Sequence, residues 1–201
     1  MTMVPRPADR PPADLRSHAA DDLRFIRSTM ERAGSFTAVP GWGTVAVGAT
    51  AVAAAALAST QPTTNRWLAV WLIEAVVAVA LGGWTLARKA RRLGLPLGSG
   101  PGRKFLLAFC PALVAGALLT AALVPMGAVA AIPAVWLLLY GTGVVAAGAF
   151  SIPAVPLQGL CFLALGAVAL FATTAGDLLL ASGFGVAHMA FGFVIARRHG
   201  G

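Results

Sequence analysis

The stretch FLLAFCPALVAGALLTAALV, residues 105–124, contains twenty residues and no charged side chain. A helix of about 20 residues is about 30 Å long, which matches the hydrocarbon core of a bilayer. The run is continuously apolar, whereas a strand of a membrane barrel alternates polar and apolar residues. It therefore predicts a transmembrane helix.

Five further apolar runs of similar length accompany this stretch, so the sequence predicts six spans. Their expected limits are about 42–59, 66–87, 105–124, 130–150, 155–173 and 177–196. The composition agrees, because 58% of the residues are apolar, 11% are charged and the mean hydropathy is +0.81. Soluble domains are about one quarter charged. We expect an all-α, polytopic transmembrane helical bundle in which residues 41–198 form a six-helix domain.

The region before the first span has a different character. Residues 1–12 hold four of the 13 prolines and are expected to form a disordered tail. Residues 13–40 are interpreted as a short cytoplasmic amphipathic helix and a linker. Leu23, Ile26 and Met30 recur at helical spacing, with arginine and glutamate residues between them.

Positive charge predicts how the spans are oriented. All 15 Lys and Arg residues except Arg66 lie before the first span, between the second and third, or after the sixth. With six spans these three regions share one side of the membrane. The positive-inside rule makes that side cytoplasmic, with both termini inside.

The basic segment between the second and third spans predicts a contact with anionic lipids of the cytoplasmic leaflet. We expect its side chains to form a patch that faces the lipid, and we expect no binding of nucleic acid. The patch consists of Arg88, Lys89, Arg91, Arg92, Arg103 and Lys104.

Glu74, eight residues into the second span, is the most informative residue. A carboxylate at such a depth costs on the order of 3 kcal/mol to insert, so it is expected to face the bundle interior and to have a partner. One interpretation is a proton or cation site, or a contact with another subunit. The other is a structural hydrogen bond to a neighbouring helix.

His188 lies in the middle of the sixth span, at a depth within about one helical turn of Glu74. If the second and sixth spans touch, the two residues form a buried pair that relays protons or binds a metal. The alternative is a histidine that packs among small residues and takes no part in chemistry.

The remaining polar residues favour structural interpretations. Asp177 begins the sixth span, where a carboxylate caps free backbone N–H groups. Cys110 and Cys161 are interpreted as small apolar fillers rather than as a redox pair. The segment 98–104 has glycines and a lysine but lacks the pattern of a phosphate-binding loop. We expect no catalytic residue, no metal site and no cofactor.

Three segments carry a resemblance to a known family. They are DLRFIRSTMERAGSFTAVPGWG (22–43), RKARRLGLPLGSGPGRKF (88–105) and WLLLYGTGVVAAGAFSIPAVPLQGLCFLALG (136–166). In these segments the chain resembles an uncharacterised family of bacterial six-span integral membrane proteins with no known activity. The resemblance covers about residue 20 to the C-terminus. It implies the six-span topology and a bacterial inner membrane, and it implies no catalytic residue.

These observations favour a non-enzymatic membrane component that binds a partner, senses or regulates. Such a role leaves room for a protein partner or for a homo-oligomer. The alternative is a small-solute or proton-coupled transporter that uses Glu74, with or without His188. A third possibility, an enzyme acting on lipid or quinone, needs a second titratable group near Glu74, and only His188 is available.

Overall fold

In the computed structural model the described residues are 21–23, 26, 35–95, 97–98 and 100–200. The chain divides into two compact units, Met1–Ser35 and Phe36–Gly201. Within the first unit, residues 21–23 and Ile26 are helical, and the side chains of Leu23 and Ile26 are exposed. The predicted tail at 1–12 lies outside the described residues, and so do most residues of the predicted helix and linker at 13–40.

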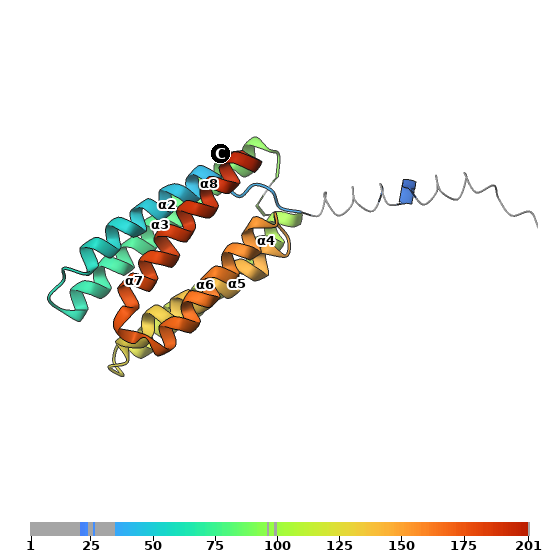
Figure 1. The fold of residues 1–201 in the computed structure, drawn as a ribbon. Coiled ribbons are helices and arrows are strands. Elements are labelled where there is room, and N and C mark those ends of the chain that lie inside the picture. Colours follow the sequence, from blue (N-terminus) through green and yellow to red (C-terminus); the bar gives the residue numbers. More distant parts are fainter. Residues whose placement is uncertain (1–20, 24–25, 27–34, 96, 99, 201) are drawn as a thin grey trace, which may run out of the picture. The chain divides into compact units, whose positions relative to one another are not determined.

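The second unit is an all-α bundle (Figure 1). Among the described residues, six helical segments are long and apolar enough to cross a membrane, as the sequence predicts. The first five are α2 (Gly41–Ala58), α3 (Thr64–Arg92), α4 (Gly100–Leu123), η1–α5 (Val129–Ala131 and Ile132–Gly148) and α6 (Ala154–Phe171). The sixth combines η2 (Thr173–Ala175), α7 (Gly176–Leu180), the π-helical segment η3 (Ala181–Ala187) and α8 (His188–His199).

Two helix ends differ by five residues from their predicted limits. α3 continues to Arg92 rather than ending near residue 87, and α4 begins at Gly100 rather than near residue 105. Basic side chains suit the last turn of a helix because they interact favourably with its dipole. Gly94, with φ of 65°, then ends α3 in the left-handed conformation that glycine adopts readily. The predicted basic loop is therefore mostly helical.

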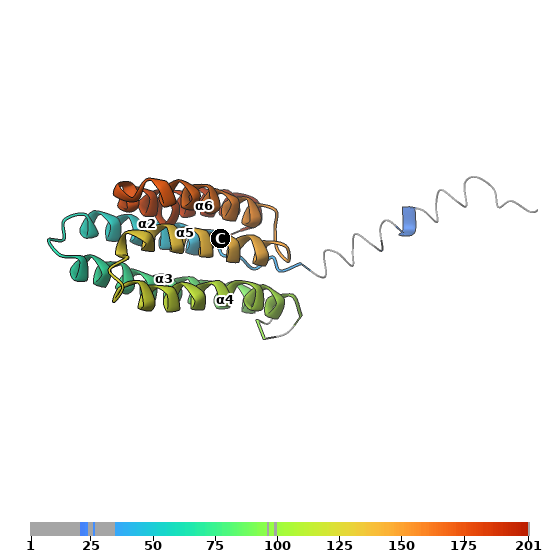
Figure 2. The same ribbon diagram turned by 90° about the horizontal axis from the view of Figure 1, so that it is seen from below.

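The helices form two groups of three. α2 lies between α3 and α8 in one group, and α5 lies between α4 and α6 in the other (Figures 1 and 2). Contacts of η3 and α8 with α6, and of α7 with α5, join the two groups. α2, which is rich in alanine and glycine, is the most buried span, whereas α3 and α4 are the least buried. The last span, through α8, thus packs in one group with the first two spans, α2 and α3.

Glycines spaced seven residues apart bring two antiparallel helix pairs into close contact. Residues seven apart lie on the same helix face, so each pair of glycines forms one flat stripe. A Cβ atom added at Gly48 would lie 2.7 Å from the carbonyl oxygen of Gly185, and one added at Gly159 would lie 2.7 Å from the nitrogen of Val145. The stripes are Gly41 and Gly48 on α2, Gly185 and Gly192 on η3–α8, Gly141 and Gly148 on α5, and Gly159 and Gly166 on α6.

The linker at 36–40 is part of the core. Phe36 is fully buried, and its ring lies 5.0 Å from that of Phe105 on α4. Its backbone N–H donates to the carbonyl oxygen of Phe150 (2.6 Å), and its carbonyl oxygen accepts from the Ser151 hydroxyl (2.8 Å). The segment before α2 is thereby attached to the turn between α5 and α6.

Candidate functional site

Glu74 has a structural partner on the neighbouring helix. It is buried on α3, where its Oε1 lies 2.9 Å from the hydroxyl of Thr50 on α2. The same hydroxyl lies 2.8 Å from the carbonyl oxygen of Val47. The Thr50 hydroxyl has one proton, so it donates to only one of these two oxygens. If it donates to Val47, a protonated Glu74 would donate to the Thr50 oxygen instead. The contact accounts for Glu74 as a residue that joins α2 to α3.

His188 bonds to a different helix. Its Nε2 lies 2.7 Å from the hydroxyl of Tyr140 on α5, and the histidine is almost completely buried. Phe162 and Phe184 flank both rings, with ring centroids 4.8–6.0 Å apart. The structure therefore places His188 in an aromatic cluster with Tyr140 and does not pair it with Glu74.

The second nitrogen of His188 is less well satisfied. Nδ1 is buried and makes no hydrogen bond of ordinary geometry to the described residues. His188 directly follows the π-helical segment η3, and such irregular turns often occur at functional positions. In the described part of the chain, no three His, Cys, Asp or Glu residues come together as metal ligands. Cys110 and Cys161 are both free thiols.

The charged end of the bundle, called here the basic end, departs from the prediction at Lys89. Lys89 was expected to face lipid, but it is buried, and its ammonium group donates to the carbonyl oxygens of Val39 (3.0 Å), His199 (3.0 Å) and Gly200 (2.5 Å). Carbonyls at the end of α8 attract a cation, since they form the negative end of the helix dipole. Lys89 therefore joins α3, the linker and α8.

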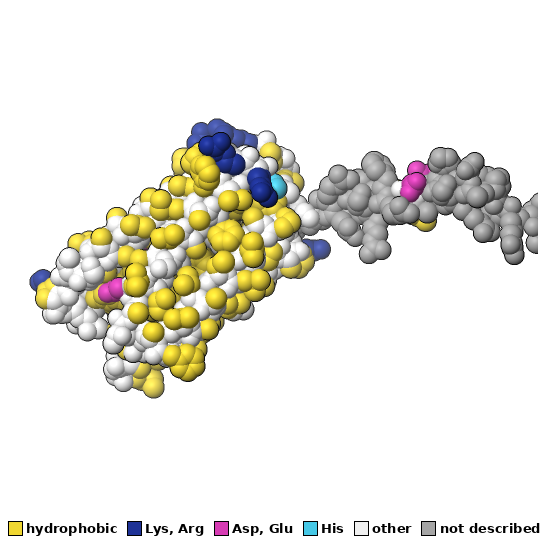
Figure 3. Space-filling model, viewed as in Figure 1, with side chains coloured by type: hydrophobic (Ala, Val, Ile, Leu, Met, Phe, Trp, Pro, Cys, Tyr) yellow, Lys and Arg dark blue, Asp and Glu magenta, His cyan; other side chains and the backbone are white. Residues whose placement is uncertain are grey.

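The other basic side chains at the basic end are exposed, and Figure 3 shows most of the Lys and Arg residues in view gathered there. Arg88 lies over the ring of Trp84 at 5.5 Å, and Arg197 lies over Phe193 at 4.9 Å. These contacts hold guanidinium groups beside aromatic rings, as expected where hydrocarbon meets headgroups. The exposed side chains are Arg88, Arg91, Arg92, Arg103, Lys104, Arg197 and Arg198.

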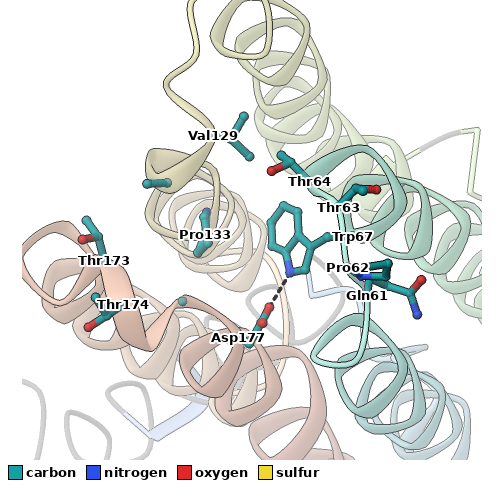
Figure 4. A pocket seen from close by; sticks show the side chains of 12 residues that line it. Gln61, Pro62, Thr63, Thr64, Trp67, Val129, Pro133, Thr173, Thr174 and Asp177 are labelled. Carbon is teal, nitrogen blue, oxygen red and sulfur yellow. Dashed lines mark hydrogen bonds between the residues drawn. The ribbon is translucent and has the colours of Figure 1, made fainter.

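A pocket of about 410 Å³ opens at the end of the bundle opposite the basic end. It lies between the start of α3, the start of α5 and the start of the last span (Figure 4). Its lining is Gln61, Pro62, Thr63, Thr64, Trp67, Val129, Ala130, Pro133, Thr173, Thr174, Gly176 and Asp177.

Asp177 and Trp67 connect two sides of this pocket. The indole N–H of Trp67 donates to Oδ1 of Asp177 at 2.6 Å. Asp177 was interpreted as a cap for backbone N–H groups, but its bond instead reaches a residue 110 positions away. Sequence reasoning missed the pocket because its residues come from three separate turns. The available signal was the concentration of threonines beside the ends of the predicted spans.

Comparisons of this chain with protein-family models, with curated proteins and with solved structures found no match.

Proposed function

We propose that this chain is a non-enzymatic, multi-pass component of a bacterial inner membrane that binds a partner and has a sensory or regulatory role. Both termini and the basic end then face the cytoplasm. The charge distribution supports this orientation, because basic residues are retained on the cytoplasmic side. The resemblance to bacterial six-span membrane proteins supports the compartment. Exposed arginines at the basic end would contact anionic headgroups.

The buried linker is the observation that carries this proposal. A flexible tether between a tail and a bundle needs no buried side chain, yet Phe36 and Ala38 are fully buried. Two hydrogen bonds to Phe150 and Ser151 and one from Lys89 to Val39 hold the same segment. The bundle thus holds the segment that directly follows the N-terminal unit, which suits a chain whose N-terminal unit binds a partner.

The described part of the N-terminal unit offers a contact surface. Leu23 and Ile26 lie three positions apart in helical backbone, and their side chains are 67% and 51% exposed. Residues three apart share a helix face, and exposed apolar faces of this kind dock into grooves of partner proteins.

Within the bundle, Glu74 and His188 each bond a structural partner, which supports a role without chemistry at these residues.

Native mass spectrometry of the full chain, extracted gently from its own membrane, tests the proposal. We expect a second protein in stoichiometric amount with the wild type. The double variant Leu23→Asp/Ile26→Asp should lose it, because two charges on the docking face oppose burial. Asp22→Asn, an exposed change beside that face, should retain it. A lone wild-type chain, or a complex that the double variant retains, contradicts the proposal.

Proton-coupled transport is the second candidate, and one observation favours it. Glu74 is a carboxyl group that is only 9% exposed at the contact between two spans, and such residues often mark proton paths. The test uses liposomes whose lumen is made electrically negative by a potassium diffusion potential. A transporter that carries protons inward would acidify this lumen. Glu74→Gln keeps a hydrogen-bonding group toward Thr50 but cannot release a proton, so it should abolish the flux. Equal flux in both proteins, or none in either, contradicts this candidate.

A further inference from the structure

We propose that the pocket opposite the basic end binds a small organic cation that carries an ammonium group. This inference concerns a different end of the molecule from the partner-binding proposal and does not depend on it. It rests on the volume of the pocket, on the single charge in its lining, and on the unused acceptor atoms there.

The charge of the lining selects the sign of the ligand. Among the described residues that line the pocket, Asp177 is the only one with a charged side chain, and Arg66, although close in sequence to Thr64 and Trp67, is not one of them. The carboxylate therefore has no cationic partner among these residues. A cation is attracted to such a site, and an anion is repelled.

Asp177 is already oriented for a ligand. Its Oδ1 accepts the indole N–H of Trp67, which fixes the plane of the carboxylate. Its Oδ2 has no hydrogen-bond partner among the described residues. Carboxylates accept through both oxygens, and a bond from an ammonium group to an ionised oxygen is among the stronger hydrogen bonds in proteins. The free oxygen is therefore the expected contact for an ammonium group.

The neighbouring groups also suit a hydrogen-bond donor. The hydroxyls of Thr173 and Thr174 lie on the opposite side of the pocket from Thr64 (Figure 4). Hydroxyl oxygens accept from an ammonium group as readily as they donate.

The volume and the aromatic ring favour an organic cation over a bare metal ion. About 410 Å³ lies in the range of small-molecule sites, and it greatly exceeds the space that one ion occupies. The indole of Trp67 extends among the lining side chains (Figure 4). Indole is the aromatic ring that attracts cations most strongly, and it also offers apolar surface to an alkyl chain.

A titration of the full chain in uncharged detergent micelles tests the proposal. The probes are n-butylammonium and ethanolammonium, with n-butanol and butyrate as neutral and anionic counterparts. Binding is followed by saturation-transfer NMR of the probe. We expect at least one of the two cations to bind the wild type, while n-butanol and butyrate bind at least tenfold more weakly.

Two variants assign the binding to the pocket. Asp177→Asn removes the charge but keeps an oxygen that accepts from Trp67, so the fold is preserved and affinity should fall about tenfold. Glu74→Gln, the matched change at the other carboxyl group of the bundle, should leave affinity unchanged. Lack of binding by both cations, equal binding of n-butanol, or unchanged affinity in Asp177→Asn overturns the proposal.

Discussion

Replacement of Phe36 by alanine is expected to lower the free energy of unfolding of the bundle by about 3–4 kcal/mol. The phenyl ring is fully buried and packs against Phe105 at the basic end. Alanine would bury less apolar surface than the ring does. It would also leave a cavity where the ring now packs against the helices of the bundle. The linker is outside the helical spans, so water is the appropriate reference state for its burial.

The measurement is reversible unfolding in detergent micelles, followed by circular dichroism. Thr37→Ala is the matched control, because Thr37 is the next residue of the same linker and is exposed. We expect its free energy of unfolding to stay within about 0.5 kcal/mol of the wild type. If Phe36→Ala unfolds like Thr37→Ala, the linker is a tether rather than part of the core, and the basis of the partner-binding proposal is lost.

The second large effect is expected at the contact between α2 and α8. Alanine at Gly192 would place a Cβ atom 2.7 Å from the backbone nitrogen of Val45 and 2.9 Å from the carbonyl oxygen of Gly41. Both neighbours are backbone atoms, so neither moves without separating the helices. We expect Gly192→Ala to cost about 2 kcal/mol and Gly192→Val to cost more, since overpacking grows with side-chain volume.

Gly83 provides the control for this pair of variants. It lies within α3, and a Cβ atom added there meets nothing within 4 Å. Because alanine favours helices more than glycine does, Gly83→Ala should be neutral or should stabilise by up to about 1 kcal/mol. Both variants gain the same helix propensity. The difference between their free energies of unfolding therefore reports the cost of the close contact at Gly192. Equal effects at both sites would show that α2 and α8 pack less closely than the glycine stripes require.

Much of the fold was predictable from sequence because hydrophobic length and charge act locally. Each span needs only its own apolar residues to cross a bilayer, so the six spans appear in the sequence one at a time. The basic end was predictable for the same reason, since arginines and lysines avoid the hydrocarbon whatever their neighbours are. Helix ends were predicted less well, because Arg88 to Arg92 continue a helix that hydropathy alone ends earlier.

The candidate sites were predicted only as single residues. Depth follows from position along a span, which is why Glu74 and His188 were placed at similar depths. Lateral neighbours do not follow from position, and the two residues contact Thr50 and Tyr140 instead of each other. The burial of Lys89 was unpredictable for the same reason. The three carbonyl groups that accept from its ammonium group belong to segments distant in the chain.

The sequence by itself therefore determined an all-α, six-span bundle with its basic residues, except Arg66, at one end. Only the tertiary structure decided which helices meet, that the linker at 36–40 is buried, and that Trp67 and Asp177 share a pocket. The physical reason is the range of the interactions. Transfer into a bilayer depends on each segment alone, whereas close packing between glycine stripes depends on the shapes of two segments distant in the chain.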